Sequence, residues 1–276
     1  MLQQQHVGGI QLKNEKHLAA MRTAGRVSAE CLAWVVVQTE AGMTTQDLDD
    51  LVGQFAKQHG AIPAPLGYRG FPRSVCTSIN EVICHGIPDR KAVLREGDIV
   101  GIDVALIVDG FHGDNAATIG VGDVDEPARR LLCATLEAQR RAIAVVRPGA
   151  RLGDVGHAIQ SHVEALGYSV VRDFVGHGVG RHFHEEPQVL HYGTPGLGTR
   201  LRAGLTFTIE PMINAGAPDI EILDDGWTAL TADRSLSAQY EHTLEVTEDG
   251  VRVLTVQNDE GVWEPPGRWT PPGFSV

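Results

Sequence analysis

The sequence REGDIVGID at residues 95–103 returns in altered form as RAGLTFTIE at residues 202–210. Both segments fit the pattern R-x-G-x-x-x-x-I-[D/E], and the same shift of 107 residues aligns Gly42 with Gly149. Chance matches at one shift are common, so coincidence is the alternative to an internal duplication. A duplication predicts two similar α/β halves, each of which brings one acidic strand end to a shared cleft, where ligand sites tend to form.

Hydrophobic periodicity supports such halves, at about residues 14–121 and 126–247. Apolar positions recur at helical spacing in four segments and alternate at strand spacing in others. The expected helices cover residues 14–38, 45–59, 126–146 and 153–166, and the expected strands cover residues 99–108, 111–121, 204–210 and 240–247. We therefore predict an α/β chain whose residues 1–260 form one domain.

The segment 99–108 carries apolar residues on one face, so Asp103 must lie on the other. Asp109-Gly110 follows and is typical of a two-residue hairpin turn. Counting outward from this turn pairs Ala105 with Asp114, which makes Asp103 and Asp114 diagonal neighbours on one face. Two isolated aspartates in a hairpin are otherwise solvated surface. Carboxylates this close repel each other, and a metal ion is a simpler solution than a shared proton.

Two glutamates of the second half also lie on polar strand faces. Glu210 ends a strand whose other face is apolar, and Glu241 lies in a strand with the same alternation. An exposed edge strand is the alternative for either residue alone. Together they supply two further carboxylates that are directed away from the hydrophobic core.

The segment GHGVGRHFHEEP at residues 176–187 has three glycines in its first five positions, which makes a helix unfavourable. We expect it to present His177 and His184 from a loop and a strand. The ordinary alternative for either residue alone is a structural histidine. Beside four directed carboxylates, an imidazole completes a ligand set suited to Mn(II), Fe(II), Co(II) or Zn(II). The set is large enough for two ions that share bridging carboxylates, with a bridging water as the nucleophile.

Composition and charge argue against nucleic-acid binding, a disulfide framework and a membrane span. The chain has 276 residues and a net charge of -12, with scattered Lys and Arg, so we expect no direct contact with nucleic acid. The four cysteines have neither C-x-x-C nor zinc-knuckle spacing, which favours a reducing compartment over a disulfide framework. The start lacks an apolar signal region, and the apolar run at 32–37 is too short to span a bilayer. We therefore expect a cytoplasmic protein with no membrane contact.

Four motifs carry a resemblance to a known family: TSINEVICHGIP at 77–88, GHGVGRHFHEEP at 176–187, TFTIEPM at 206–212 and SAQYEHT at 237–243. With them, the chain resembles the type I methionine aminopeptidases of peptidase family M24 from about residue 10 to about residue 256. The resemblance implies the pita-bread fold, in which pseudo-twofold α/β halves form a central curved antiparallel sheet covered by helices. It also implies a metalloaminopeptidase that removes the initiator methionine from nascent proteins.

The resemblance implies a role for each matching residue. Two divalent ions would be held by Asp103, Asp114, His177, Glu210 and Glu241, with Asp114 and Glu241 as bridges. Glu210 would also carry a proton from the bridging water to the leaving amine. His184 would steady the carbonyl oxygen, and His85 would contact the scissile amide. A plainer alternative for His85 is that it terminates the strand before it.

The resemblance also implies a pocket for the methionine side chain. Its residues would be Tyr68, Phe71, Cys76, Phe183 and Trp227, which suit a thioether, although each alone is ordinary core. The family implies a small second residue and a free amine, so a formylated N-terminus should not react. Two departures affect the pocket: Pro65 replaces a cysteine common among relatives, and residues 115–117 are Asn-Ala-Ala where relatives often have Thr-Ser.

Further expectations concern ions and partners. Relatives bind a monovalent cation, Na⁺ or K⁺, near Asn80, Val82 and Ser237. The expected partners are nascent polypeptide N-termini and, transiently, the ribosome. The absence of a long apolar stripe favours a monomer. The tail at 261–276, with WEPPG echoed by WTPPG, should be extended and packed on its own surface, with docking on a partner as the alternative.

Two other functions share this fold. An Xaa-Pro aminopeptidase or prolidase would have the same five ligands but usually has a large additional N-terminal domain. A non-catalytic peptide- or ribosome-binding module would be expected to have lost ligands or the helper histidines, and neither loss is seen in this sequence.

Overall fold

A computed structural model describes residues 5–7 and 9–256, and the predicted tail at 261–276 lies outside the described residues. In chain order the elements are β1 (Gln5–Val7), β2 (Ile10–Leu12), α1 (Glu15–Gln38), α2 (Thr45–Gln58), β3 (Ile62–Pro63), η1 (Tyr68–Gly70), β4 (Cys76–Ile79), β5 (Val82–Cys84), β6 (Ile99–Val108), β7 (Phe111–Gly120), α3 (Glu126–Ala144), α4 (Leu152–Ala165), β8 (Ser169–Val170), β9 (Gly176–Gly178), β10 (Glu185–Val189), β11 (Thr206–Ile209), β12 (Met212–Asn214), β13 (Ile220–Ile222), β14 (Ala229–Thr231), β15 (Ser237–Val246) and β16 (Val251–Val253).

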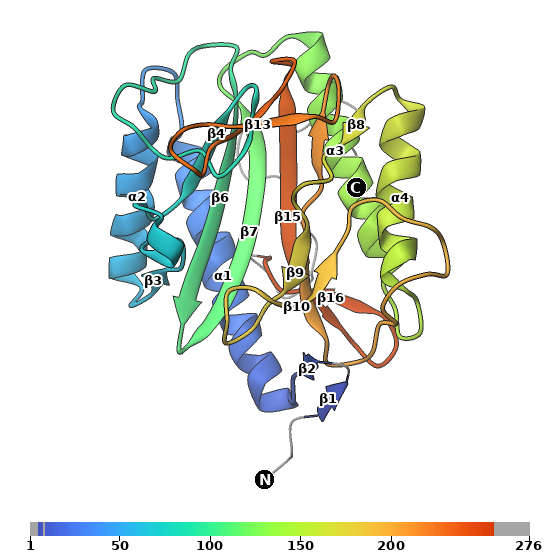
Figure 1. Ribbon diagram of the computed structural model, residues 1–276. Helices are drawn as coiled ribbons and strands as arrows, with labels where there is room; N and C mark the ends of the chain where they lie inside the picture. The colour runs from blue at the N-terminus through green and yellow to red at the C-terminus, as the bar shows by residue number, and fades with distance from the viewer. Residues whose placement is uncertain (1–4, 8, 257–276) are drawn as a thin grey trace.

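The largest sheet has the path β10-β9-β11-β15-β7-β6-β3, with β4, β12 and β16 joined to its members. Its paired strands are antiparallel, and the four helices lie behind and beside it (Figure 1). The predicted α/β class is therefore confirmed. Among the described helices, none combines the length and hydrophobicity that a membrane span requires.

The four helices begin and end within two residues of the predicted bounds. The strand predicted at 240–247 begins earlier, at Ser237, because its first residues pair with β12. The strand predicted at 204–210 is shorter, since β11 ends at Ile209 and a separate strand, β12, follows Pro211. Proline has no N–H to donate, which explains the interruption of the ladder there.

The two halves repeat the same backbone hydrogen bonds at the predicted shift. Gly42 N–H donates to Leu94 O at 2.8 Å, and Gly149 N–H donates to Leu201 O at 2.9 Å. Both glycines have φ near +90°, a left-handed backbone conformation that residues with a side chain rarely adopt. These bonds tie the loop before α2, and the loop before α4, to the segment that precedes the acidic strand of each half.

The β6–β7 hairpin has the predicted register. Val108 pairs with Phe111 and Ala105 pairs with Asp114, and both turn residues, Asp109 and Gly110, have positive φ. No bulge interrupts the pairing between Ile99 and Val108, so Asp103 and Asp114 lie on one face of the sheet.

The hydrophobic core lies between the sheet and the helices. Val100, Ile102 and Val104 on β6 pack into a cluster with side chains of α1 and α2, and Phe207 and Ile209 on β11 pack with α3 and α4. Truncating a fully buried phenylalanine such as Phe207 should cost about 3–5 kcal/mol. Because apolar side chains fill the helix-facing side, the polar residues between them are directed to the opposite face.

The second half contains an insertion that the first half lacks. Ile99 pairs with Gly120 in the first half, and Thr206 pairs with Glu245 in the second. The shift is therefore 107 residues on the first strand and 125 on the second. The additional chain includes β13 and β14, which form a small sheet with β5 and add a wall beside the polar face.

Candidate metal centre

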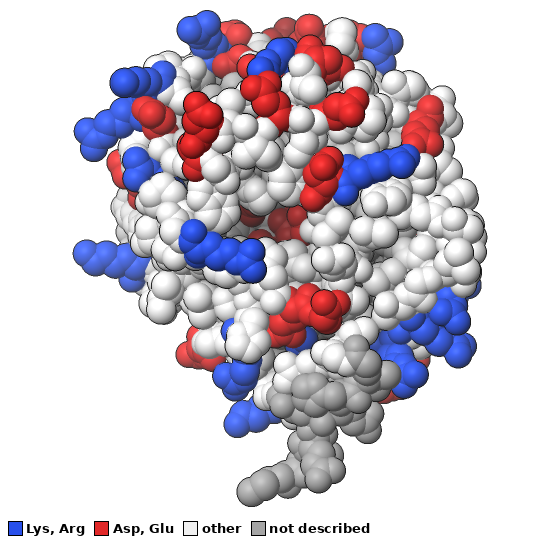
Figure 2. Space-filling model, viewed as in Figure 1, with Lys and Arg blue, Asp and Glu red and all other residues white. Residues whose placement is uncertain are grey.

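A cavity of about 630 Å³ opens on the polar face of the sheet. Figure 2 shows it as a hollow near the middle of the view, with acidic atoms at its floor. Its lining includes every predicted metal ligand and substrate-binding residue: Tyr68, Phe71, Cys76, His85, Asp103, Asp114, His177, Phe183, His184, Glu210, Trp227 and Glu241. The structure thus brings together residues separated by up to 173 positions in the sequence.

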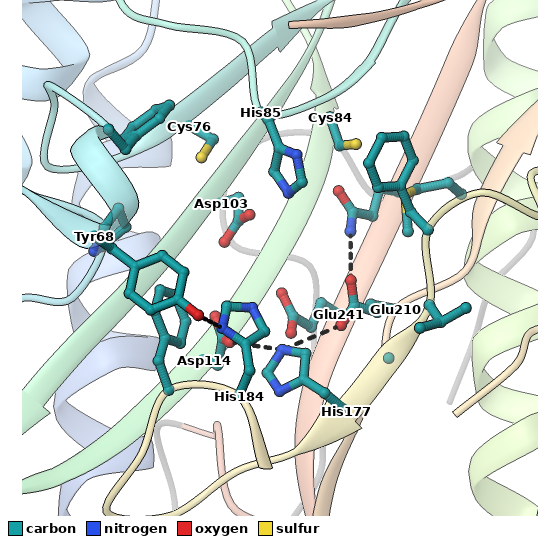
Figure 3. Close-up of a pocket in the computed structure, with 18 of the residues that line it drawn as sticks. Tyr68, Cys76, Cys84, His85, Asp103, Asp114, His177, His184, Glu210 and Glu241 are labelled. Carbon is teal, nitrogen blue, oxygen red and sulfur yellow. Dashed lines mark hydrogen bonds and ion pairs between the residues drawn. The ribbon is translucent and has the colours of Figure 1, made fainter. Parts of the chain in front are cut away.

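Five different elements position the candidate ligands (Figure 3). Asp103 lies on β6, Asp114 on β7 and Glu241 on β15, which are neighbours in the sheet. His177 lies on β9, and Glu210 directly follows β11. Glu241 is 3% exposed and lies on a central strand, so the exposed-edge alternative for it is wrong.

The ligand atoms are close enough to share an ion. His177 Nε2 lies 3.6 Å from Asp114 Oδ2 and 3.6 Å from Glu210 Oε1. Ligand atoms of Asp114, His177 and Glu241 all lie within 4.8 Å of one another. His177 Nδ1 lies 2.9 Å from Gly178 O, which can only accept, so Nδ1 carries the proton and Nε2 presents its lone pair to the carboxylates.

Electrostatics also favour a bound cation. Burial raises the pKa of Asp103 to about 7 and that of Glu210 to about 8. Burial, and then repulsion between the carboxylates, raises the pKa of Asp114 and of Glu241 well above the usual range. Within residues 9–256, no Lys or Arg forms an ion pair with any of the four. Divalent ions fit this donor set, because they would compensate the buried negative charge.

Two side chains orient the Glu210 carboxylate from opposite sides. Thr208 Oγ donates to Oε1 at 2.7 Å, and Gln239 Nε2 donates to Oε2 at 3.3 Å. Sequence reasoning missed both residues. The signal was available, because Thr208 and Gln239 each lie two positions before a candidate ligand and so face the same side of their strands.

The two helper histidines reach the cavity from different walls. His184 is exposed and its Nδ1 lies 2.9 Å from the Tyr68 hydroxyl, which holds the ring near the candidate ligands (Figure 3). His85 directly follows β5 and has a φ of 56°, which turns the chain away from the strand. Its ring meets Phe174 edge-on, with centroids 5.2 Å apart. His85 therefore both terminates its strand and lines the cavity, so the two readings expected for it are compatible.

Aromatic and sulfur-containing side chains form the apolar wall. Phe71 and Trp227 meet edge-on with centroids 5.2 Å apart, and Cys76 is buried beside them in the lining. Phe174 and Met212 also line the cavity and were missed from sequence. Met212 lies within a quoted motif, whereas nothing in the sequence around Phe174 distinguishes it from ordinary core.

The three residues expected at a monovalent cation are absent from this lining. Ser237 N–H donates to Asn80 O at 2.9 Å, and Val82 lies on β5, two residues after Asn80. The Asn80 side chain is bonded to Asp98 and to the Ile99 N–H.

The family model described as "Metallopeptidase family M24" matches residues 19–248. The chain belongs to metallopeptidase family M24. Membership implies that it is a hydrolase that uses a divalent metal. Methionine aminopeptidase A of Synechocystis sp. is 55% identical over 247 residues, covering 90% of this chain and 98% of that protein. Methionine aminopeptidase of Escherichia coli K12 is 49% identical over 255 residues, covering 92% and 96%.

Comparison with solved structures points to the same family. The crystal structure of methionine aminopeptidase from Rickettsia prowazekii has a TM-score of 0.88 at 51% identity, covering 90% of this chain and 100% of that one. The prolidase of Pyrococcus horikoshii has a TM-score of 0.71 at 22% identity, and only 65% of that chain is covered, so it shares the fold alone. The expected pita-bread fold and the expected membership of the type I methionine aminopeptidases are confirmed, and the chain is an enzyme of the methionyl aminopeptidase class.

Proposed function

We propose that this M24 aminopeptidase removes methionine from nascent proteins at a dinuclear metal centre. The ligands would be Asp103, Asp114, His177, Glu210 and Glu241. One observation carries the proposal: the buried carboxylates of Asp114 and Glu241, the half-buried carboxylates of Asp103 and Glu210, and the Nε2 lone pair of a neutral imidazole converge beneath an aromatic wall. The ions bound there would be Co, Mn, Fe or Zn, and they would supply Lewis acidity toward the scissile carbonyl and toward water.

The protein's own groups would handle protons and orientation. Glu210 would take a proton from water and pass it to the leaving amine, as the family resemblance implies, and the hydrogen bonds from Thr208 and Gln239 would hold its carboxylate in place. His184 would donate to the carbonyl oxygen, and the Tyr68 hydroxyl would hold its ring in place. His85 would contact the scissile amide from the opposite wall.

The proposed substrate preferences come from the cavity lining and from the family resemblance. Tyr68, Phe71, Cys76, Phe183 and Trp227 would surround an unbranched thioether, and sulfur packs favourably against aromatic edges. A free amine would be needed beside the metal centre, so a formylated N-terminus would be excluded. A small second residue would be preferred, as the family resemblance implies.

We also propose the wider setting expected from the sequence. Residues 1–260 would act as one catalytic domain in a cytoplasmic monomer, whose substrates are nascent N-termini presented transiently at the ribosome. A monovalent cation would be held near Asn80, Val82 and Ser237.

The test is release of methionine from Met-Gly-Met-Met and from its N-formyl counterpart. Purified protein is stripped of metal and then given Mn(II) or Co(II). We expect metal-restored cleavage of the free-amine peptide alone. An Ala-Pro peptide is the control, since faster cleavage of it would favour an Xaa-Pro peptidase. Absence of release with any metal, from protein shown to be folded, would instead favour a binding module of the same fold.

A further inference from the structure

A buried ion pair joins the N-terminal segment to the loop that carries His184. Lys13 Nζ lies 2.6 Å from Glu185 Oε2, although the two residues are 172 positions apart in the sequence. Their side chains are only 2% and 8% exposed. Buried pairs are uncommon and costly to form, so an ion pair at this position calls for an explanation.

The surrounding backbone is shaped to admit this pair. A Cβ atom on Gly180 would lie 2.6 Å from Glu185 Oε1 and 2.7 Å from Lys13 Cε, so a larger residue there would displace one of the two side chains. Lys13 N–H donates to Gly204 O at 2.7 Å, which fixes the lysine's own backbone. Both partners are therefore held in place by close packing as well as by charge.

Glu185 ties together the turn that precedes it. Its Oε1 accepts the His182 N–H at 3.1 Å, while its Oε2 binds Lys13. Gly180 N–H donates to His182 O at 3.2 Å, which closes the turn from the other side. Residue 185 also starts β10 by pairing with Gly178. The Glu185 carboxylate is thus the link between Lys13 and the turn of residues 180–185.

His184 depends on this turn for its position. It immediately precedes Glu185, so its backbone belongs to the turn that the Glu185 carboxylate ties together. Its ring lies 4.2 Å from that of His177, centroid to centroid, and bonds the Tyr68 hydroxyl over the cavity (Figure 3). A shift of the backbone at Glu185 would carry the His184 ring away from the metal centre.

We propose that Lys13 is a positioning residue for catalysis: through Glu185 it holds the turn of residues 180–185 so that the His184 ring stays over the metal centre. The inference rests on the proposed function of His184 and adds the residue that sets its geometry. Without Lys13, the Glu185 carboxylate would be buried without a cation and would move toward water. It would then release the His182 N–H and loosen the turn.

The first experiment compares Lys13→Met with wild-type protein in methionine release from Met-Gly-Met-Met. We expect kcat to fall on the order of 10- to 100-fold, because displacing an aligned group by about 1 Å has effects of this size. KM should change much less, and bound metal, measured by atomic emission, should be unchanged. The matched control is Glu245→Gln, which removes another buried ion-paired glutamate outside the cavity and should leave kcat within about twofold.

The second experiment repeats Lys13→Met in a His184→Ala background. If Lys13 acts through His184, its replacement should now lower kcat by less than about twofold, because residues that act as a unit are not additive. An equal loss in both backgrounds would overturn the proposal, and so would wild-type kcat in folded Lys13→Met protein. If Lys13→Met does not fold, Lys13→Met/Glu185→Ala, which leaves no unpaired charge and removes the acceptor of the His182 N–H, replaces it in both experiments. Inactive wild-type protein would overturn the proposed function itself, whereas an active wild type with an unaffected variant overturns only the role of Lys13.

Discussion

The two halves of the molecule share a scaffold but not a ligand pattern. Asp103 within β6 and Glu210 directly after β11 occupy equivalent positions, 107 residues apart, and in this they are counterparts. The partner strands differ. Asp114 pairs with Ala105, and at the equivalent place in the second half Gln239 pairs with Met212. The second carboxylate of that half is Glu241, two residues further along, where strand geometry places it about 6.6 Å away.

This difference shows how a duplicated fold forms an asymmetric site. A symmetric donor set would put a carboxylate at Gln239, whereas that residue donates an N–H to Glu210. The halves also differ where their strands connect. The first uses the tight turn at Asp109-Gly110, while the second uses the insertion that carries Trp227. The candidate metal ligands therefore lie on strands common to both halves, and part of the cavity wall comes from chain present in only one.

The largest effect should come from removing a carboxylate that the second half does not match. Asp114→Asn should lower metal affinity and kcat/KM by more than about 1000-fold, since loss of an outer partner alone typically costs 10- to 100-fold. Metal binding is measured by calorimetry and activity by methionine release. A variant that keeps two tightly bound ions would contradict the role assigned to Asp114.

A smaller loss should follow from changing its counterpart. Gln239→Ala removes the N–H that orients Glu210 Oε2, and we expect kcat to fall about 10- to 100-fold with metal still bound. Gln239→Glu provides the sharper comparison, because it restores the acidic pattern of the first half and adds a fifth negative charge. We expect it to be at least as impaired, and activity near wild type would show that the asymmetry is not required.

The pH dependence of stability should depend on whether metal is bound. The pKa of Asp103 and that of Glu210 are raised in the folded state, to about 7 and about 8, so the folded chain holds protons that the unfolded chain has lost. Stability of metal-free protein should therefore fall as pH rises from 7 to 8.5. The histidine pKa shifts are downward and act mainly below this window. Melting curves with and without Mn(II) test this, and a Tm that is flat in metal-free protein would refute it.

The smallest effect concerns the helix caps that the halves repeat. Asp47 accepts the Thr44 N–H at the start of α2, and Asp154 accepts the Arg151 N–H at the start of α4. Replacing either by Ala should cost about 0.5–2 kcal/mol. The second bond of Asp47 comes from the exposed Thr44 hydroxyl, whereas that of Asp154 comes from the Gly196 N–H at 2.7 Å and ties in a distant segment, so loss of Asp154 should lower Tm more. Equal shifts in Tm would mean that this extra bond contributes nothing.

Much of the site was visible in the sequence because strand alternation has a period of two. That period assigned Asp103, Asp114, Glu210 and Glu241 to polar faces, and the Asp109-Gly110 turn fixed the register of the first pair. The same rule applied two residues upstream would have found Gln239. Phe174 could not be found this way, because its contact with His85 joins two loops with no local pattern.

The sequence by itself determined the periodicity of each element, the hairpin register and the repeat, because these depend on neighbours a few residues apart or on identity at a fixed shift. Only the tertiary structure decided which strands adjoin, and so it decided that Glu241 lies on a central strand next to Asp114's strand. It also decided that Lys13 is buried against Glu185. Such contacts form between distant segments, and their stability comes from burial and charge compensation that no local pattern encodes.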